Sequence, residues 1–315
     1  MLTQKIIKGW LPGLSAVFRY HLPLRPIPYP MVQFSNTRNY LTVREKIIET
    51  TGCKIKMIPE DSCMEFIHGS LNDVILIRID QLPAGTDFNF FGHSYWHEMG
   101  HFYANNANDE LEKYNAPDNP PLEEPEETVK YKQRGYWFWD EFIAEALANY
   151  VDYKFRSSNP ENPSEPNPSY QPEKIDWKVE NWGDMADWLM DLLEQTFWTY
   201  EDVDEYILAH YFATLLMNDK FIGYVNAVCD GKLKICGKDI PEAPGTIEPT
   251  CISDQEEEFQ PILWEMKAVL EGQMKKEQFW KTDAAMLEKL GRLIYGLDKI
   301  KEDMMANMMA MEEDY

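Results

Sequence analysis

Residues 96–102 read Trp-His-Glu-Met-Gly-His-Phe, and the fold is predicted outward from this stretch. It contains HExxH, in which His97 and His101 are four residues apart. On an α-helix that spacing brings both imidazoles to one face, one turn apart, where they can bind a single zinc ion. Glu98 can take a proton from a zinc-bound water, whose pKa the metal lowers to about 7. The motif predicts a helix that carries two metal ligands and a general base.

His93 extends the series to HxxxHExxH. Along an ideal helix His93 and His101 are about 12 Å apart, which is too far for zinc–nitrogen bonds of about 2 Å to join both. We therefore assign His93 to the start of the helix or the rim of the pocket, with a role as a metal ligand as the minor alternative.

A catalytic zinc needs a third protein ligand as well as an open position for water. Residues 137–151, WFWDEFIAEALANYV, have the apolar stripe of a second helix. Glu141 and Glu145 lie one turn apart on one face of that helix. Their spacing alone does not choose between them as the third ligand.

With Glu145-Ala146-Leu147-Ala148-Asn149 downstream of HExxH, the sequence resembles the zincin metallopeptidases of the gluzincin type, which include thermolysin-like enzymes. The strand and loop that lead into HExGH, with Glu-x-x-Ala-Asn, also look like the intracellular ImmA/IrrE peptidases. The resemblance covers roughly residues 73–151. It implies that Glu145 is the third ligand, that Asn149 can hold a ligand imidazole's other nitrogen, and that Zn²⁺ supports hydrolysis of a protein or peptide substrate.

The fold class we expect is α+β, with a zincin-like core over residues 1–156. This core consists of a small sheet, the active-site helix and the third-ligand helix. The opening segment to about Pro30 is proline-rich and is expected to be irregular. The elements predicted after it are a helix at 39–51, strands at 53–58 and 73–79, and helices at 91–105 and 137–155.

Residues 74–79 have two interpretations. By resemblance to zincins they form an edge strand that pairs with an extended substrate. They equally fit a plain strand in the core of the sheet.

The rest of the chain is predicted from composition. Residues 157–175 are rich in proline and form a linker or surface loop. Residues 176–315 have mostly helical periodicity, with a hairpin-like segment at 229–236 between the helical parts. We therefore expect a mainly helical C-terminal region.

The composition excludes two classes of partner. Lys and Arg total 30 against 54 Asp and Glu, and the net charge of -24 repels nucleic acid and anionic membranes. The five cysteines form no CxxC pair, which favours free thiols in a reducing compartment. No secretory signal or membrane-spanning run is evident, so we expect a cytoplasmic protein; its oligomeric state is not indicated.

Two further questions stay open. The residue that stabilises the oxyanion is not assigned, because His210, Tyr150 and Tyr211 are chemically suitable but lie in apolar helical stretches that favour a core role. Two other functions compete with peptide hydrolysis. One is a catalytically silent zincin-fold regulator, and the other is an acidic protein-interaction module that mimics DNA.

Overall fold

The structure is a computed structural model, and it describes the following residues: 3–22, 28–53, 62–115, 124–158, 192, 195–197, 202–217 and 258–313. These residues form an α+β fold, mostly helical, with one three-stranded mixed sheet, which confirms the predicted class. The chain divides into two compact units. The sheet unit comprises Met1–Asn119 and Ile143–Asn167, and the helical unit comprises Pro120–Phe142 and Pro168–Tyr315.

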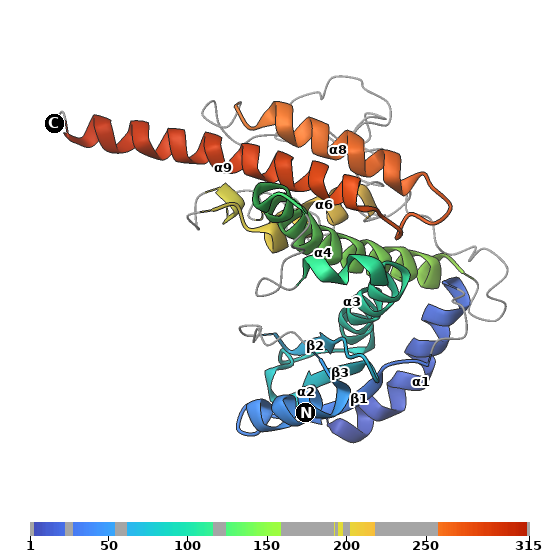
Figure 1. The fold of residues 1–315 in the computed structure, drawn as a ribbon. Helices are drawn as coiled ribbons and strands as arrows, with labels where there is room; N and C mark the ends of the chain where they lie inside the picture. The colour runs from blue at the N-terminus through green and yellow to red at the C-terminus, as the bar shows by residue number, and fades with distance from the viewer. Residues whose placement is uncertain are drawn as a thin grey trace, which may run out of the picture. The chain divides into compact units, whose positions relative to one another are not determined.

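The sheet has the strand order β1-β3-β2. The central strand β3 (Val74–Arg78) is parallel to β1 (Met31–Ser35) and antiparallel to β2 (Met64–Ile67) (Figure 1). Every residue of β3 is buried, as its continuous run of β-branched and apolar residues predicts. Residues 74–79 therefore contain a core strand, and their interpretation as an edge strand is wrong.

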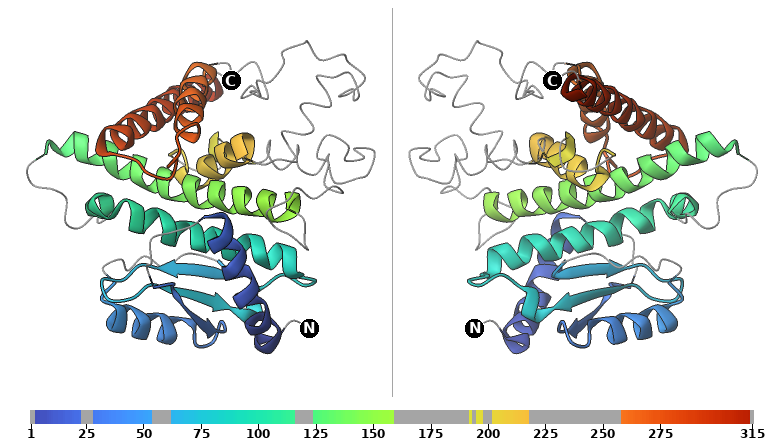
Figure 2. Two further views of the ribbon diagram at one scale, coloured as in Figure 1. Left: turned by 90° about the vertical axis from the view of Figure 1, so that its right-hand side faces the viewer. Right: turned by 90° about the vertical axis from the view of Figure 1, so that its left-hand side faces the viewer.

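Two helices cover the two faces of this sheet (Figures 1 and 2). On one face α2 (Tyr40–Thr51) follows Asn39 and ends at Gly52, whose φ of 71° is readily adopted by glycine. The opposite face is covered by α3 (Phe88–Ala107). The core under α2 contains two residues of that helix and three residues of the strands: Tyr40, Ile47, Ile67, Val74 and Leu76.

The expectation of an irregular opening segment is wrong, because α1 spans Gln4–His21. Thr3 caps the helix by accepting a hydrogen bond from the Ile6 N–H. Pro12 removes one helical hydrogen bond. The buried stripe of Ile7, Leu14 and Phe18 offsets that loss by packing against α3.

The helix predicted at 137–155 is longer than expected, because α4 runs continuously from Glu126 to Ser157. Short 3₁₀ turns follow β3 and α3, namely η1 (Ile79–Gln81) and η2 (Asp109–Tyr114). The predicted strand at 53–58, the hairpin at 229–236 and nearly all of the 157–175 linker lie outside the described residues.

The helical unit contains the first part of α4 and three more described helices, α6 (Glu205–Met217), α8 (Gln260–Met274) and α9 (Ala284–Glu313). Glycines allow α4 and α9 to approach closely, because a side chain on Gly135 would overlap the backbone of Leu287. No helix among the described residues is both long and apolar enough to cross a bilayer.

Candidate metal centre

The HExxH stretch lies in the middle of α3, as predicted. The helix begins after Asp87, whose side chain accepts a hydrogen bond from the Phe90 N–H at 2.9 Å. Trp96 and Phe102 are buried, and the Trp96 indole N–H donates to the Leu14 carbonyl of α1 at 3.1 Å. These contacts fix the rotation of α3 about its axis, and with it the direction in which the histidines point.

His97 and His101 face each other. Their Nε2 atoms are 3.2 Å apart and their rings are nearly perpendicular, at 82°. Two zinc–nitrogen bonds of about 2.0–2.1 Å at a tetrahedral angle place the two nitrogens roughly 3.3–3.4 Å apart. The observed spacing therefore fits a shared metal ion.

Gly100 brings α4 close to this pair. A Cβ atom on Gly100 would lie 2.6 Å from the carbonyl oxygen of Ala144, so the two backbones meet where a side chain has no room. The residue that follows Ala144 is Glu145, whose side chain consequently projects beside the histidines. The small residues in both helices are what bring the two halves of the predicted ligand set together.

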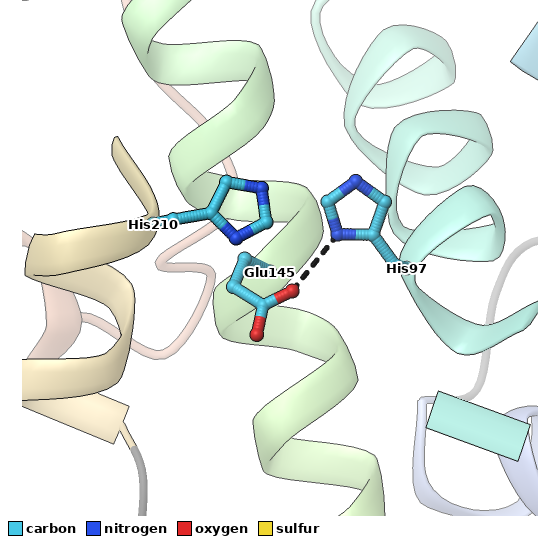
Figure 3. Close-up of side chains that lie close together, drawn as sticks. All are labelled: His97, Glu145 and His210. Atoms are coloured by element: carbon cyan, nitrogen blue, oxygen red, sulfur yellow. Dashed lines mark hydrogen bonds and ion pairs between the residues drawn. The ribbon is translucent and has the colours of Figure 1, made fainter. Parts of the chain in front are cut away.

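Glu145 is buried at 6% exposure and its carboxylate holds three groups. Oε2 is 3.0 Å from Nδ1 of His97 (Figure 3), and Oε1 is 3.0 Å from Nε2 of His93. Asn149 donates from Nδ2 to Oε1 at 3.1 Å. A solvated position for Glu145 is excluded, and Asn149 contacts the glutamate and not an imidazole in these recorded bonds.

The contact between His93 and Glu145 was not predicted. His93 lies at the rim of the site, with 34% of its side chain exposed. Burial lowers its pKa, but the Glu145 carboxylate outweighs that effect and the net shift is upward. The sequence contains one signal for this contact. His93 and His97 are four residues apart, so both side chains lie on the face of α3 that α4 covers.

Glu98 is buried at 8% exposure. Burial raises the pKa of the Cys63 thiol, and the negative charge of Glu98 raises it further. Cys63 directly precedes β2, whose Phe66 ring is parallel to the His101 ring at a centroid distance of 6.3 Å. The predicted base therefore faces the β2 side of the site.

The remaining sequence candidates are placed as follows. Glu141 lies one turn before Glu145 in α4. Within the helical unit Nε2 of His210, which Figure 3 also draws, is 3.9 Å from the Glu141 carboxylate. Tyr211 is buried in α6, and burial raises the pKa of Tyr150. These positions assign no oxyanion donor.

The donor set suits a metal ion. His97 and His101 belong to one group of side chains whose potential ligand atoms all lie within 4.8 Å of one another. His97 and Glu145 belong to a second group that meets the same condition. Imidazole nitrogen and carboxylate oxygen are ligands that zinc commonly takes. The protein thus contains histidine and glutamate groups that can bind a metal ion.

Comparison with known proteins adds no assignment to this geometry. The chain matches no protein-family model, no curated protein and no solved structure at the threshold of significance.

Proposed function

We propose that the protein is a zinc-dependent metallopeptidase in which His97, His101 and Glu145 hold the metal and Glu98 is the general base. The observation that carries the proposal is the proximity of the His97 and His101 rings, whose centroids are 4.8 Å apart, to two buried carboxylates. Buried carboxylates are costly unless they serve a cation or several donors. A divalent ion at this position would balance their charge.

Each side chain has a separate task in this proposal. Zinc, when bound, would supply a more acidic water and polarise the carbonyl of the substrate. Glu98 takes the proton from the attacking water and returns it to the leaving amine.

Glu145 can serve as a ligand only if the His97 ring is turned. In its present orientation, Nδ1 of His97 contacts the Glu145 carboxylate and Nε2 of His97 faces His101. Turning the His97 ring over exchanges Nε2 with Cε1, the atom between the two nitrogens. Nε2 would then face both His101 and Glu145, as an ion shared by all three residues would require. If the ring keeps its present orientation, Glu145 instead orients His97, and Glu141 stays the alternative ligand that the sequence leaves open.

A strand that an extended peptide could pair with lies at the site. Among the described residues β2 pairs with β3 alone, and Phe66 of β2 stacks on His101. Pairing of a peptide with the side of β2 that faces away from β3 would carry its backbone past the histidines. The free thiol of Cys63 fits the reducing compartment, the cytoplasm, that we propose for the protein.

The test measures metal content and proteolysis together. Purified full-length protein should contain stoichiometric zinc by mass spectrometry and should cleave an unstructured casein substrate. Glu98→Gln should retain zinc and lose cleavage by 100-fold or more, since general-base catalysis contributes about 10²–10⁴-fold. Glu45→Gln, an exposed glutamate of α2, is the matched control and should change neither quantity.

Each other outcome has a defined meaning. Equal cleavage by wild type and Glu98→Gln would overturn the mechanism. Bound zinc without cleavage of casein or of a peptide library would favour the silent regulator. Absence of zinc, with His97→Ala indistinguishable from wild type, would favour the acidic interaction module. Counting zinc ligands by X-ray absorption in Glu145→Gln and Glu141→Gln separates the two glutamates, because only the ligand's variant loses an oxygen neighbour.

A further inference from the structure

A second group of metal-ligating side chains lies in the sheet unit, outside the HExxH site. His68, Asp109 and Glu112 each offer one ligand atom, and these atoms lie within 4.8 Å of one another. His68 directly follows β2, while Asp109 and Glu112 belong to η2, the 3₁₀ turn after α3. In a 3₁₀ turn the side chains at i and i+3 point the same way, so the two carboxylates converge on the imidazole.

His68 is held in the tautomer that binds metals. Its Nδ1 is 2.7 Å from Oδ1 of Asp73, a carboxylate only 9% exposed. Because an ionised carboxylate only accepts hydrogen bonds, Nδ1 is the donor, and in the neutral ring Nε2 carries the free lone pair. Metal-bound histidines are commonly fixed in this way by a carboxylate on the other nitrogen.

Asp73 is itself fixed. Its Oδ1 also accepts from the Gly69 N–H at 3.2 Å, and its Oδ2 accepts from Nδ2 of Asn106 in α3 at 3.3 Å. The histidine therefore rests on a carboxylate that the loop after β2 and the end of α3 both support. A simple surface salt bridge does not require this second layer of contacts.

We propose that His68, Asp109 and Glu112 form a second divalent-cation site, with Asp73 as the residue that orients His68. One imidazole and two carboxylates favour zinc or a similar transition metal over magnesium or calcium, which prefer oxygen ligands alone. The ion would join the end of β2 to η2. It shares no ligand with the HExxH site and does not depend on the proposed peptidase function.

The two sites are nevertheless adjacent. The Phe66 ring has centroid distances of 6.1 Å to His68 and 6.3 Å to His101. Phe66 is thus the side chain that contacts a ligand of each site. An ion at His68 would hold the end of β2 in place next to the HExxH pair, which makes its role structural.

The test isolates the second site. Full-length protein carrying His97→Ala and His101→Ala is stripped with EDTA and titrated calorimetrically with Zn²⁺. We expect one equivalent to bind. Adding Asp109→Asn with Glu112→Gln should weaken binding tenfold or more, and Asp73→Asn should weaken it about 10–100-fold, as for other orienting carboxylates. Glu110→Gln, an exposed glutamate of the same η2 turn, is the control and should leave the affinity unchanged.

The outcomes separate this site from the HExxH site. If the His97→Ala, His101→Ala protein has a native circular dichroism spectrum yet binds no Zn²⁺, the second site does not exist. Equal weakening by Glu110→Gln and by the Asp109, Glu112 pair would also refute it, because binding would then be diffuse attraction to acidic residues. Should the histidine variant fail to fold, the Asp109, Glu112 pair in the wild-type background must lower the bound zinc by one equivalent.

Discussion

Gly100 lies directly against Ala144, with a hypothetical Cβ on Gly100 only 2.6 Å from the Ala144 carbonyl oxygen and 2.7 Å from its Cα. This contact joins the HExxH helix to the helix that carries Glu145. The position of the glutamate relative to the histidines therefore depends on the absence of one side chain. Several measurable consequences follow for the metal centre.

Gly100→Ala should push α3 and α4 apart. Overpacking of this kind costs about 1–3 kcal/mol of unfolding free energy, and zinc affinity should fall roughly tenfold as Glu145 withdraws from His97. Gly9→Ala is the matched control, because Gly9 is helical but has nothing within 4 Å of its hypothetical Cβ. The control should be neutral or more stable by up to about 1 kcal/mol. Urea unfolding and zinc titration measure both effects, and equal behaviour of the two variants would contradict the packing argument.

Asn149→Ala should weaken zinc binding about tenfold, because it removes the amide that holds Oε1 of Glu145. Asn108→Ala is the control. It also removes a buried amide, one that donates to the Ala104 carbonyl at the C-terminal end of α3 at 2.7 Å. Competition with a chromogenic chelator measures the affinity. An unchanged zinc affinity in Asn149→Ala would show that the amide does not position the glutamate.

Glu65→Gln should destabilise the sheet unit by about 3 kcal/mol. The Glu65 carboxylate accepts from Arg44 Nε at 2.7 Å and from the Tyr40 hydroxyl at 2.7 Å, and Arg44 is almost fully buried. The neutral amide cannot balance the guanidinium charge. Thermal unfolding of Glu65→Gln is compared with that of Glu49→Gln, an exposed glutamate of α2 whose loss should cost less than about 0.5 kcal/mol.

Tyr40 makes the stability of the fold sensitive to alkali. Burial, together with the hydrogen bond to Glu65, raises the pKa of Tyr40 well above its usual value. Because the pKa of Tyr40 is raised in the folded state, its contribution to the free energy of unfolding is complete below the unfolded pKa of about 10. That contribution is lost as pH rises above this value. Tyr40→Phe should therefore flatten the decline in unfolding free energy above about pH 10, whereas Tyr20→Phe, at an exposed position, should leave the decline unchanged.

Local patterns were sufficient to predict the elements that carry the chemistry. α3 and β3 were predicted because their apolar patterns are long and continuous. The residue types in each pattern also suit a helix and a strand, respectively. α1 was missed because Pro12 and Gly13 weaken the local helical signal, and only burial against α3 compensates. β2 was missed because its four residues are too few to show a period.

The site shows the same division between local and long-range information. His97, Glu98 and His101 follow from one heptad-length stretch, and the helix carrying Glu145 follows from its own pattern. The packing of Gly100 on Ala144 brings the two helices together, and no spacing of residues in the sequence predicts that contact. His68 and η2 are separated by about 40 residues of sequence, so their proximity depends on how β2 packs against α3.

The 3.2 Å separation of the two Nε2 atoms also has a consequence for protons. A gap of that length between two imidazoles accommodates a single shared hydrogen, donated by one ring and accepted by the other. A metal ion that uses the lone pairs of both Nε2 atoms must displace that hydrogen, either to the other nitrogen of the same ring or to solvent. The ring that donates the hydrogen therefore has to change its tautomer or lose the proton before both rings can bind one ion.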